Sequence, residues 1–579
     1  MKPKEYFEKI NSPTRKKYEA LKAFFLDNLP ANEVAAKFGY EINSVYSMAR
    51  DLNMQLTKHP HVDPFFIQPK KGRSFKKETP SIVSLIVALR KKNLSSPDIK
   101  SILDSQGQEV SERYITDVLK REGFARLPRR SKEHKGNRDI PDIPAPKSLS
   151  IDFSNETFSS SDIGILCFLP IIKYYGIDKI IKDSDYPETT IIDRFSSIMA
   201  FLALKLSNVR RYTADDLWCM DRGIGFFAGL NVLPKAAWFT SYSHRITKEM
   251  NLSFLRNLHQ LWLEKNLFGD TINIDFTTIP YWGDDAHLEK NWSGKRRHSL
   301  SSMLAVLAQE PDSGIIDYGD ADILHKNEDA VVLEFLDFYR DGKKDSNLKY
   351  LVFDSKFTCY ENLAILDEKE IKFVTIRRRG KRIVEKIENI PTDKWKKIKV
   401  ECAGNKKRTI RVNDDSIMLK GFKKEIRQIA ITGHGKIKPA LIITNDFELK
   451  TEDIVRKYTR RWLVEKSISE QIDFFHLNRV SSSMVVKVDF DLTMSITAHN
   501  LYRLIANDFN RYENLADNTI YEDFIKNSGD IEISDSEVKV FMKKKRALPI
   551  ILSSMKFFEN QSYSWMKNKK LMFYGATRT

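Results

Sequence analysis

The hydrophobic pattern of this 579-residue chain changes at residue 271. Before it, apolar residues recur at helical spacing, as in Ile191–Leu204, and glycines are few. After it, short β-rich runs bounded by turn residues predict strands at Thr271–Pro280, His298–Gln309, Gly314–Tyr318, Leu348–Phe353, Ile371–Ile376 and Pro439–Thr444. Helical patterns at Glu328–Phe338 and Glu361–Asp367 separate the middle strands. This order predicts an α/β fold with a mixed sheet flanked by helices.

Two acidic residues lie where apolar strand runs end in this region. Asp275 comes after Ile272 and Ile274, and Asp354 comes after Phe353. Strands hold side chains at fixed separations, and carboxylate oxygens are ligands that Mg²⁺ prefers. Two such ions can activate a water or a 3′-hydroxyl and stabilise the leaving oxygen in phosphoryl transfer. The pattern predicts that chemistry, with a third ligand still required.

The third candidate ligand lies in a long amphipathic helix predicted over Thr451–Phe475. Tyr458, Arg461 and Glu465 are separated by three and four residues, so they share one helix face. Glu465 can complete a metal site, and Arg461 can hold a phosphate through two hydrogen bonds. Asp446, which follows another strand, is an alternative third ligand; Glu465 is favoured.

The same residues resemble a known family. Tyr458-x2-Arg461-x3-Glu465 resembles the tyrosine–arginine–glutamate signature of insertion-sequence transposases of the IS4 superfamily (IS1634-like). The segments Asp275–Gly283 and Leu351–Phe357 resemble their two aspartate blocks, and the resemblance covers roughly residues 165–510.

The resemblance implies an RNase H-like core of the DDE type, interrupted by a β-strand insertion. It implies that Asp275, Asp354 and Glu465 are catalytic and hold two Mg²⁺ (or Mn²⁺) ions, with Tyr458 and Arg461 at the DNA. The family places a lysine seven residues after the glutamate, where this chain has Ile472. That departure leaves open how the transposon end is gripped.

Two units that precede this core show helix-turn-helix patterning. In residues 1–58, helices at Arg15–Asn28, Asn32–Phe38 and Asn43–Leu52 are predicted around a left-handed turn at Gly39, with Asn43 as a cap. The outward face of the last helix offers a polar set able to enter a major groove: Asn43, Ser44, Tyr46, Ser47 and Arg50. Residues 78–125 repeat the pattern. Plain three-helix bundles are the alternative.

Further basic residues are candidates for DNA contact. The linker 126–160 carries Arg129 and Arg130, which suit either solvent or phosphate. Arg377, Arg378 and Arg379 leave a strand beside the proposed site. Trp282 and Trp292, with the basic run Lys295–His298, fit either base stacking with backbone contact or core packing with solvent exposure.

The remaining divisions follow from these patterns. We expect a helical domain at 161–268, the RNase H-like core at 269–381 and 439–510, the β-strand insertion at 382–438, and a C-terminal region at 511–579. Alternating runs at Thr409–Val412 and Glu425–Thr432 indicate strands within the insertion. Four cysteines without C-x-x-C spacing argue against structural zinc.

Charge and hydropathy restrict the partners. The formal charge of +17 favours a polyanion, usually nucleic acid. The longest apolar runs are too short to span a membrane, and the start of the sequence lacks a secretory signal.

We therefore expect a DNA transposase in the cytoplasm of a bacterium or archaeon, associated with the nucleoid. It binds the terminal inverted repeats and target DNA as double-stranded DNA, as a homodimer because two ends must be joined. Alternatives are a DNA-binding regulator with a decayed nuclease core, a metal-dependent nuclease without strand transfer, and a helical scaffold for acidic proteins.

Overall fold

The computed structural model describes most of the chain, which divides into two compact units, Met1–Ile143 and Pro144–Thr579. The described residues are 13–58, 63, 65, 80–91, 94–105, 108, 110–124, 151, 153–209, 216–280, 288–293, 298–340, 347–402, 406–435, 438–477, 485–509 and 512–576.

The first unit begins with α2 (Pro13–Phe25), α3 (Ala31–Phe38) and α4 (Ile42–Lys58). Gly39 ends α3 in the left-handed conformation with φ 62°, as its position predicts. Val45 is fully buried between the helices, whereas Tyr46 is exposed. Because α4 begins at Ile42, Asn43 lies in its first turn, and the prediction that Asn43 caps this helix is wrong.

The first unit continues with α5 (Pro80–Lys91), α6 (Ser96–Ser105) and α7 (Glu112–Arg121). Ser95 and Asp98 form a reciprocal cap at the start of α6, in which the Ser95 backbone N–H donates to the Asp98 carboxylate at 3.1 Å. The hydroxyl of Ser111 accepts from the Tyr114 N–H at 3.1 Å and caps α7. These capped helices surround a core that includes Ile86, Ile99 and Ile115. Their assignment as helix-turn-helix units remains a prediction.

The second unit is built on a mixed ten-stranded sheet, which confirms the predicted mixed α/β class. Its order is β3 (Lys290–Ser293), β4 (His298–Gln309), β2 (Thr271–Pro280), β6 (Tyr350–Phe353), β7 (Lys372–Ile376), β11 (Ala440–Thr444), β10 (Glu425–Thr432), β9 (Lys406–Met418) and β8 (Lys396–Cys402), with β5 (Ile316–Ile323) paired to β4. The central β2, β6 and β7 run parallel, and their other neighbours are antiparallel. Strands β2, β4 and β10 have the predicted bounds.

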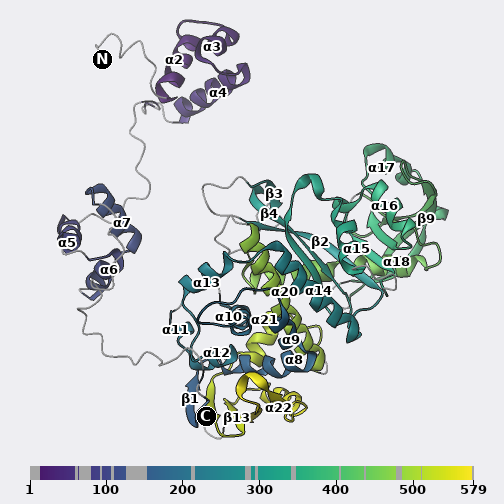
Figure 1. The fold of residues 1–579 in the computed structure, drawn as a ribbon. Coiled ribbons are helices and arrows are strands. Elements are labelled where there is room, and N and C mark those ends of the chain that lie inside the picture. Colours follow the sequence, from purple (N-terminus) through teal and green to yellow (C-terminus); the bar gives the residue numbers. More distant parts are fainter. Residues whose placement is uncertain are drawn as a thin grey trace. The chain divides into compact units, whose positions relative to one another are not determined.

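Helices pack against this sheet from both sides. The region predicted to be helical contains α8 (Phe168–Tyr175), α9 (Ile177–Asp183), α10 (Arg194–Leu206), α11 (Asp216–Cys219), α12 (Arg222–Phe227), α13 (Ala236–Ser243) and α14 (Lys248–Glu264). Later helices are α15 (Val331–Arg340), α16 (Tyr360–Glu368), α20 (Val485–Asp508), α21 (Asp517–Ile520) and α22 (Leu548–Lys556). Both α14 and α20 lie beside β5, and Figure 1 shows these two helices next to each other. Within the described residues, none of the helices combines the length and apolar character needed to cross a bilayer.

Two helical predictions require correction. The single helix expected over 451–475 is α18 (Thr451–Thr459) followed by α19 (Trp462–Asp473), with a break at Arg460 and Arg461. The insertion predicted at 382–438 is not purely β-structure, because α17 spans Lys381–Glu388. Its strands β8, β9 and β10 extend the main sheet beyond β11.

A second sheet joins the two ends of this unit. Its order is β1 (Glu156–Ser160), β12 (Gly529–Ile533), β13 (Glu537–Met542), β15 (Lys569–Gly575) and β14 (Ser562–Tyr563). Strand β1, from the end of the predicted linker, pairs antiparallel with β12, with Phe158 opposite Ile531.

Close backbone packing beside this sheet yields a stability prediction. A Cβ at Gly164 meets the backbone oxygen of Ile525, which cannot rotate away. We expect Gly164→Ala to lower the free energy of unfolding by about 1–3 kcal/mol, because overpacking forces the backbone to shift. At Gly575, where a Cβ meets only side-chain carbons at 3.5 Å or more, the same substitution should change it by less than about 0.5 kcal/mol. Urea unfolding of both variants checks this; equal effects contradict it.

Candidate active site

The register of two parallel strands brings the predicted aspartates together. In the β2–β6 pair, Ile274 lies opposite Phe353, and the next positions along the two strands are Asp275 and Asp354. Neighbouring strands are about 4.8 Å apart, and side chains alternate between faces. Both carboxylates therefore lie on the sheet face that carries Asn273. Asp275 is inside β2 rather than at its end, because β2 continues beyond the end of β6.

Arg461 connects this pair to the predicted glutamate. Its Nη1 forms a close ion pair with Oδ2 of Asp275, and its Nη2 donates to Oε1 of Glu465 at 2.6 Å. The side chains of Asp275 and Arg461 are each 14% exposed, whereas that of Glu465 is 54% exposed. One guanidinium thus holds a buried and a solvent-facing carboxylate on the same side of the sheet.

The site concentrates negative charge. Burial raises the pKa of Asp275 to about 6, with Arg461 and the Phe276 N–H opposing the shift and Glu465 and Asp354 adding to it. In the part of the chain that the structure describes, Asp354 forms neither an ion pair nor a side-chain hydrogen bond. These carboxylates are therefore a donor set able to bind cations.

Tyr458 packs against the guanidinium of Arg461. Its ring centroid lies 5.6 Å from the guanidinium carbon. Burial raises the pKa of Tyr458 to about 12, with Arg461 opposing the shift. Tyr458 therefore stays a neutral phenol that supports Arg461.

Polar contacts fix α18 and α19 along β2. Lys457 donates to the hydroxyl of Thr271 at 2.6 Å, and the amide of Asn273 donates to the carbonyl of Arg460 at 3.2 Å. Arg460 in turn pairs with Asp312 at 2.6 Å. These contacts place the helix break beside the strand that carries Asp275.

The loop after Asp354 is held from two sides. The rings of Phe276 and Phe357 stack at 3.9 Å with planes 8° apart, which ties the loop to β2. Arg378 donates to the carbonyls of Ser355 and Lys356 at 3.1 and 3.3 Å.

The two neighbouring arginines also contact the protein itself. Arg377 donates to the Gln428 side chain at 2.6 Å, and Arg379 donates to the Pro439 carbonyl. The predicted DNA-binding run is thus engaged within the fold, and Arg378 is its exposed member.

The alternative ligand Asp446 lies elsewhere. It follows β11, which runs antiparallel to β7, whereas Asp354 follows β6, which runs parallel to β7. Asp446 and Asp354 therefore lie at opposite ends of these strands. Its carboxylate accepts from the Tyr350 hydroxyl at 2.5 Å and from two backbone N–H groups, those of Glu448 and Leu449. Asp446 therefore stabilises the turn after β11, remote from Asp275.

Other predicted residues have separate locations. Ile472, at the position of the family lysine, is partly buried and packs against the main core. This position therefore does not place a positive charge in solvent. Trp292 is 59% exposed. The predictions for Arg129, Arg130, Trp282 and the residues 295–297 fall outside the described residues.

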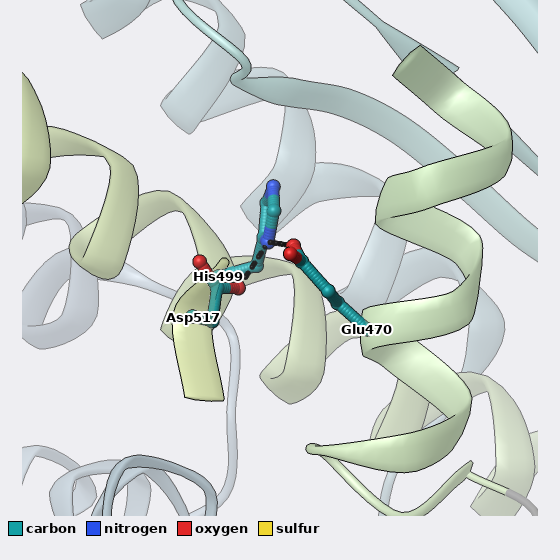
Figure 2. Close-up of side chains that lie close together, drawn as sticks. All are labelled: Glu470, His499 and Asp517. Atoms are coloured by element: carbon teal, nitrogen blue, oxygen red, sulfur yellow. Dashed lines mark hydrogen bonds and ion pairs between the residues drawn. The ribbon is translucent and has the colours of Figure 1, made fainter. Parts of the chain in front are cut away.

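A second charged cluster, which the sequence analysis missed, lies at the other end of α19. Nδ1 of His499 lies 2.6 Å from Oδ2 of Asp517 and 3.7 Å from Oε2 of Glu470 (Figure 2). Nε2 of His499 lies 3.1 Å from the Gly314 carbonyl oxygen. Oxygen atoms of Asp517 and Gly314 therefore face the two ring nitrogens of His499. Although three potential ligand atoms lie within 4.8 Å, this cluster differs from the Asp275–Asp354–Glu465 set.

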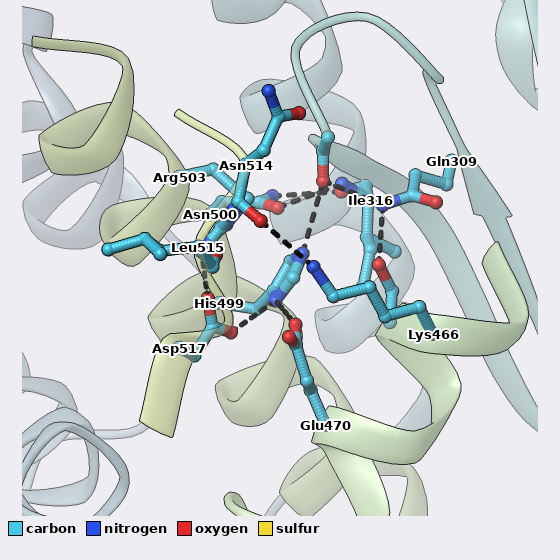
Figure 3. Close-up of polar contacts among 12 residues, drawn as sticks. Gln309, Ile316, Lys466, Glu470, His499, Asn500, Arg503, Asn514, Leu515 and Asp517 are labelled. Atoms are coloured by element: carbon cyan, nitrogen blue, oxygen red, sulfur yellow. Dashed lines mark hydrogen bonds and ion pairs between the residues drawn. The ribbon is translucent and has the colours of Figure 1, made fainter. Parts of the chain in front are cut away.

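Surrounding donors make the cluster a structural junction. Arg503 donates to the Asp517 carboxylate at 2.5 Å and to the Leu515 carbonyl at 2.7 Å (Figure 3). Burial raises the pKa of Glu470 to about 7, and Asp517 adds to the shift. The cluster joins α19, α20 and α21, and so fixes the helix that carries Glu465. Glu470 and Asp517 are far from each other in sequence, and no motif connects them.

This junction predicts a large stability effect. Asp517 is fully buried beside His499 and Arg503, so Asp517→Ala leaves the buried Arg503 without its ion pair and Nδ1 of His499 without its nearest partner. We expect a loss of about 3–5 kcal/mol in urea unfolding. Asp337, 70% exposed in a pair with Lys369, is the control, and Asp337→Ala should cost less than about 1 kcal/mol. A similar small cost for Asp517→Ala would show that the junction is not essential.

A protein family and a solved structure resemble this chain. The chain is similar, at 10% sequence identity, to a piggyBac transposase in a synaptic complex with hairpin DNA. The match covers 64% of this chain and 82% of that chain, with a TM-score of 0.32. No curated protein matches the chain. Residues 267–501 match the family described as the transposase DDE domain, a range that includes Asp275, Asp354 and Glu465. This family match supports a DDE transposase.

Proposed function

We propose that the chain is the DNA transposase of an insertion sequence, of the IS4 superfamily and IS1634-like, with an RNase H-like core of the DDE type. The observation that carries this proposal is the convergence of three carboxylates. Asp275 and Asp354 each come one residue after the pair Ile274–Phe353 of the parallel strands β2 and β6, and Arg461 holds Glu465 to Asp275. Such a set suits phosphoryl transfer on DNA.

The three carboxylates fit divalent cations. Hard oxygen donors dominate the set, and the mutual repulsion of these groups is relieved by added positive charge. Asp275, Asp354 and Glu465 would hold the two ions. When bound, Mg²⁺ or Mn²⁺ supplies Lewis acidity and neutralises charge on the reacting phosphate.

The residues of the chain position the reacting groups. The Phe276 N–H donates to Oδ1 of Asp275 at 2.8 Å, and Arg461 occupies Oδ2, so the orientation of this carboxylate is fixed. A water oxygen first attacks the phosphorus at each element end, and the 3′-oxygen leaves with a proton. The freed 3′-hydroxyl then attacks a target phosphodiester in line, the bond from phosphorus to the target's own 3′-oxygen breaks, and that oxygen leaves with the proton of the attacking hydroxyl. Positioning of this kind contributes much of the rate in phosphoryl transfer.

The helices of the first unit are assigned to DNA recognition in this proposal. The exposed Asn43, Tyr46 and Arg50 on α4 suit contact with a major groove. Two such units on one chain suit the terminal inverted repeats. Joining two ends favours a homodimer, and the DNA substrate assigns the protein to the nucleoid of a bacterial or archaeal cell.

The first test compares the two rival third ligands. Asp275→Asn and Glu465→Gln should each lower Mg²⁺-dependent cleavage of element-end DNA by more than about a hundredfold, since even outer contacts at metal sites cost ten- to a hundredfold. Binding to the ends should stay within a few-fold. Asp446→Asn is the control, and it should retain cleavage while lowering thermal stability.

Each outcome distinguishes a function. Cleavage that survives Glu465→Gln but not Asp446→Asn contradicts the assigned ligand. End binding without cleavage by the unmodified protein indicates a regulator, and nicking without joined products indicates a nuclease.

A second test concerns the guanidinium that joins the carboxylates. Arg461→Lys retains the charge but loses the fork that contacts Asp275 and Glu465 together. We expect cleavage to fall about ten- to a hundredfold at unchanged end binding. Arg456→Lys, in an exposed pair with Asp453, should cleave normally. Equal activity of the two variants would show that Arg461 does not organise the site.

A further inference from the structure

The β8–β9 hairpin has one apolar and one charged face. Ile398 and Val400 on β8, with their neighbours Ile410 and Val412 on β9, are buried in a core that also contains Ile454 of α18. Side chains alternate along each strand, so the residues between them point away from that core.

The opposite face, here named the basic hairpin face, carries four exposed cations: Lys397, Lys399, Lys407 and Arg411. Within the described residues none of these four forms an ion pair. On the neighbouring strands β10 and β11, Ile387 of α17 packs on Ala430 and Leu441 instead. The cations therefore face solvent on the hairpin itself.

The register makes this arrangement costly without a partner. Lys397 lies directly opposite Arg411, and Lys399 lies diagonally between Arg411 and Lys407, whereas Lys407 itself lies opposite Glu401. Like charges directly opposite each other destabilise a sheet, whereas opposite charges stabilise it. A ligand with closely spaced negative charges removes this repulsion.

We propose that the basic hairpin face binds the phosphate backbone of duplex DNA. The inference rests on the proposed function, which supplies DNA as the ligand. It adds a contact surface outside the candidate active site. Three of the four cations are lysines, which act as point charges and suit backbone phosphate more than base edges. Binding there is therefore independent of sequence and sensitive to salt.

Protection of a sheet edge is the competing explanation. Strand β8 is the edge of the main sheet, and lysines on edge strands prevent pairing with other chains. In that case the cations affect self-association and leave DNA affinity unchanged.

The test measures binding of the full chain to a short duplex of unrelated sequence over a range of KCl concentrations. One variant carries Lys397→Gln, Lys399→Gln, Lys407→Gln and Arg411→Gln together. A control removes the same charge from exposed lysines elsewhere in the second unit, by Lys179→Gln, Lys265→Gln, Lys556→Gln and Lys570→Gln. Thermal unfolding and light scattering verify that each variant is folded and unassociated.

The expected result is a shallower dependence of log affinity on log salt for the hairpin variant. Each lost phosphate contact removes about 0.9 from the slope, so the change reaches about 3.6 if all four cations contribute. Affinity at fixed moderate salt should fall about tenfold or more. A charge-preserving variant that carries Lys397→Arg, Lys399→Arg, Lys407→Arg and Arg411→Lys should bind like the unmodified chain.

Two results overturn the proposal. If the hairpin variant has the same salt slope and DNA affinity as the control variant, the face does not contact DNA. If the hairpin variant self-associates at an unchanged salt slope, the cations protect the sheet edge. Failure here is separate from failure of the proposed function. If only the hairpin proposal fails, the unmodified chain still cleaves element ends. If the proposed function fails, the unmodified chain does not cleave them at all.

Discussion

The candidate active site depends on the parallel pairing of β2 with β6. Parallel strands cannot be joined by a tight turn, and here β3, β4, β5 and α15 lie between them in the chain. In the register of β2 with β6, Asp275 and Asp354 follow the paired residues Ile274 and Phe353. A shift of one residue would turn one carboxylate to the opposite face. The apolar residues Ile274 and Phe353, which precede the two aspartates, oppose that shift because they belong to the core.

The third carboxylate, that of Glu465, is positioned by charged contacts at two points of α19. Arg461 fixes the start of α19 at Asp275, and the Glu470–His499–Asp517 cluster fixes its other end to α20 and α21. Buried ion pairs contribute little net stability but are costly to break, so they favour one arrangement over others. Glu465, between these points, is itself more than half exposed and accessible to solvent.

Local patterns in the sequence were sufficient to predict several strands and the residues of the candidate active site. Alternating apolar residues give the bounds of β2, β4 and β10. The spacing of Tyr458, Arg461 and Glu465 indicates that Arg461 lies next to the other two, although Tyr458 and Glu465 lie on two separate helices. The break at Arg460 could not be predicted, because contacts to Asn273 and Asp312 hold it there. Spacing alone could not separate Asp446 from Glu465, since the direction of β11 in the sheet decides that. The partners of His499 come from segments distant in sequence, which local periodicity does not report.

The pairing of β1 with β12 has a consequence for synthesis of the protein. When the ribosome has completed α20, the segments with all three carboxylates exist, but Glu156–Ser160 still has no neighbouring strand. Contacts between such distant segments form slowly because a long loop must close first. The second unit can therefore complete its fold only after its last strands have left the ribosome, so a nascent chain carries the three carboxylates before it carries the finished scaffold.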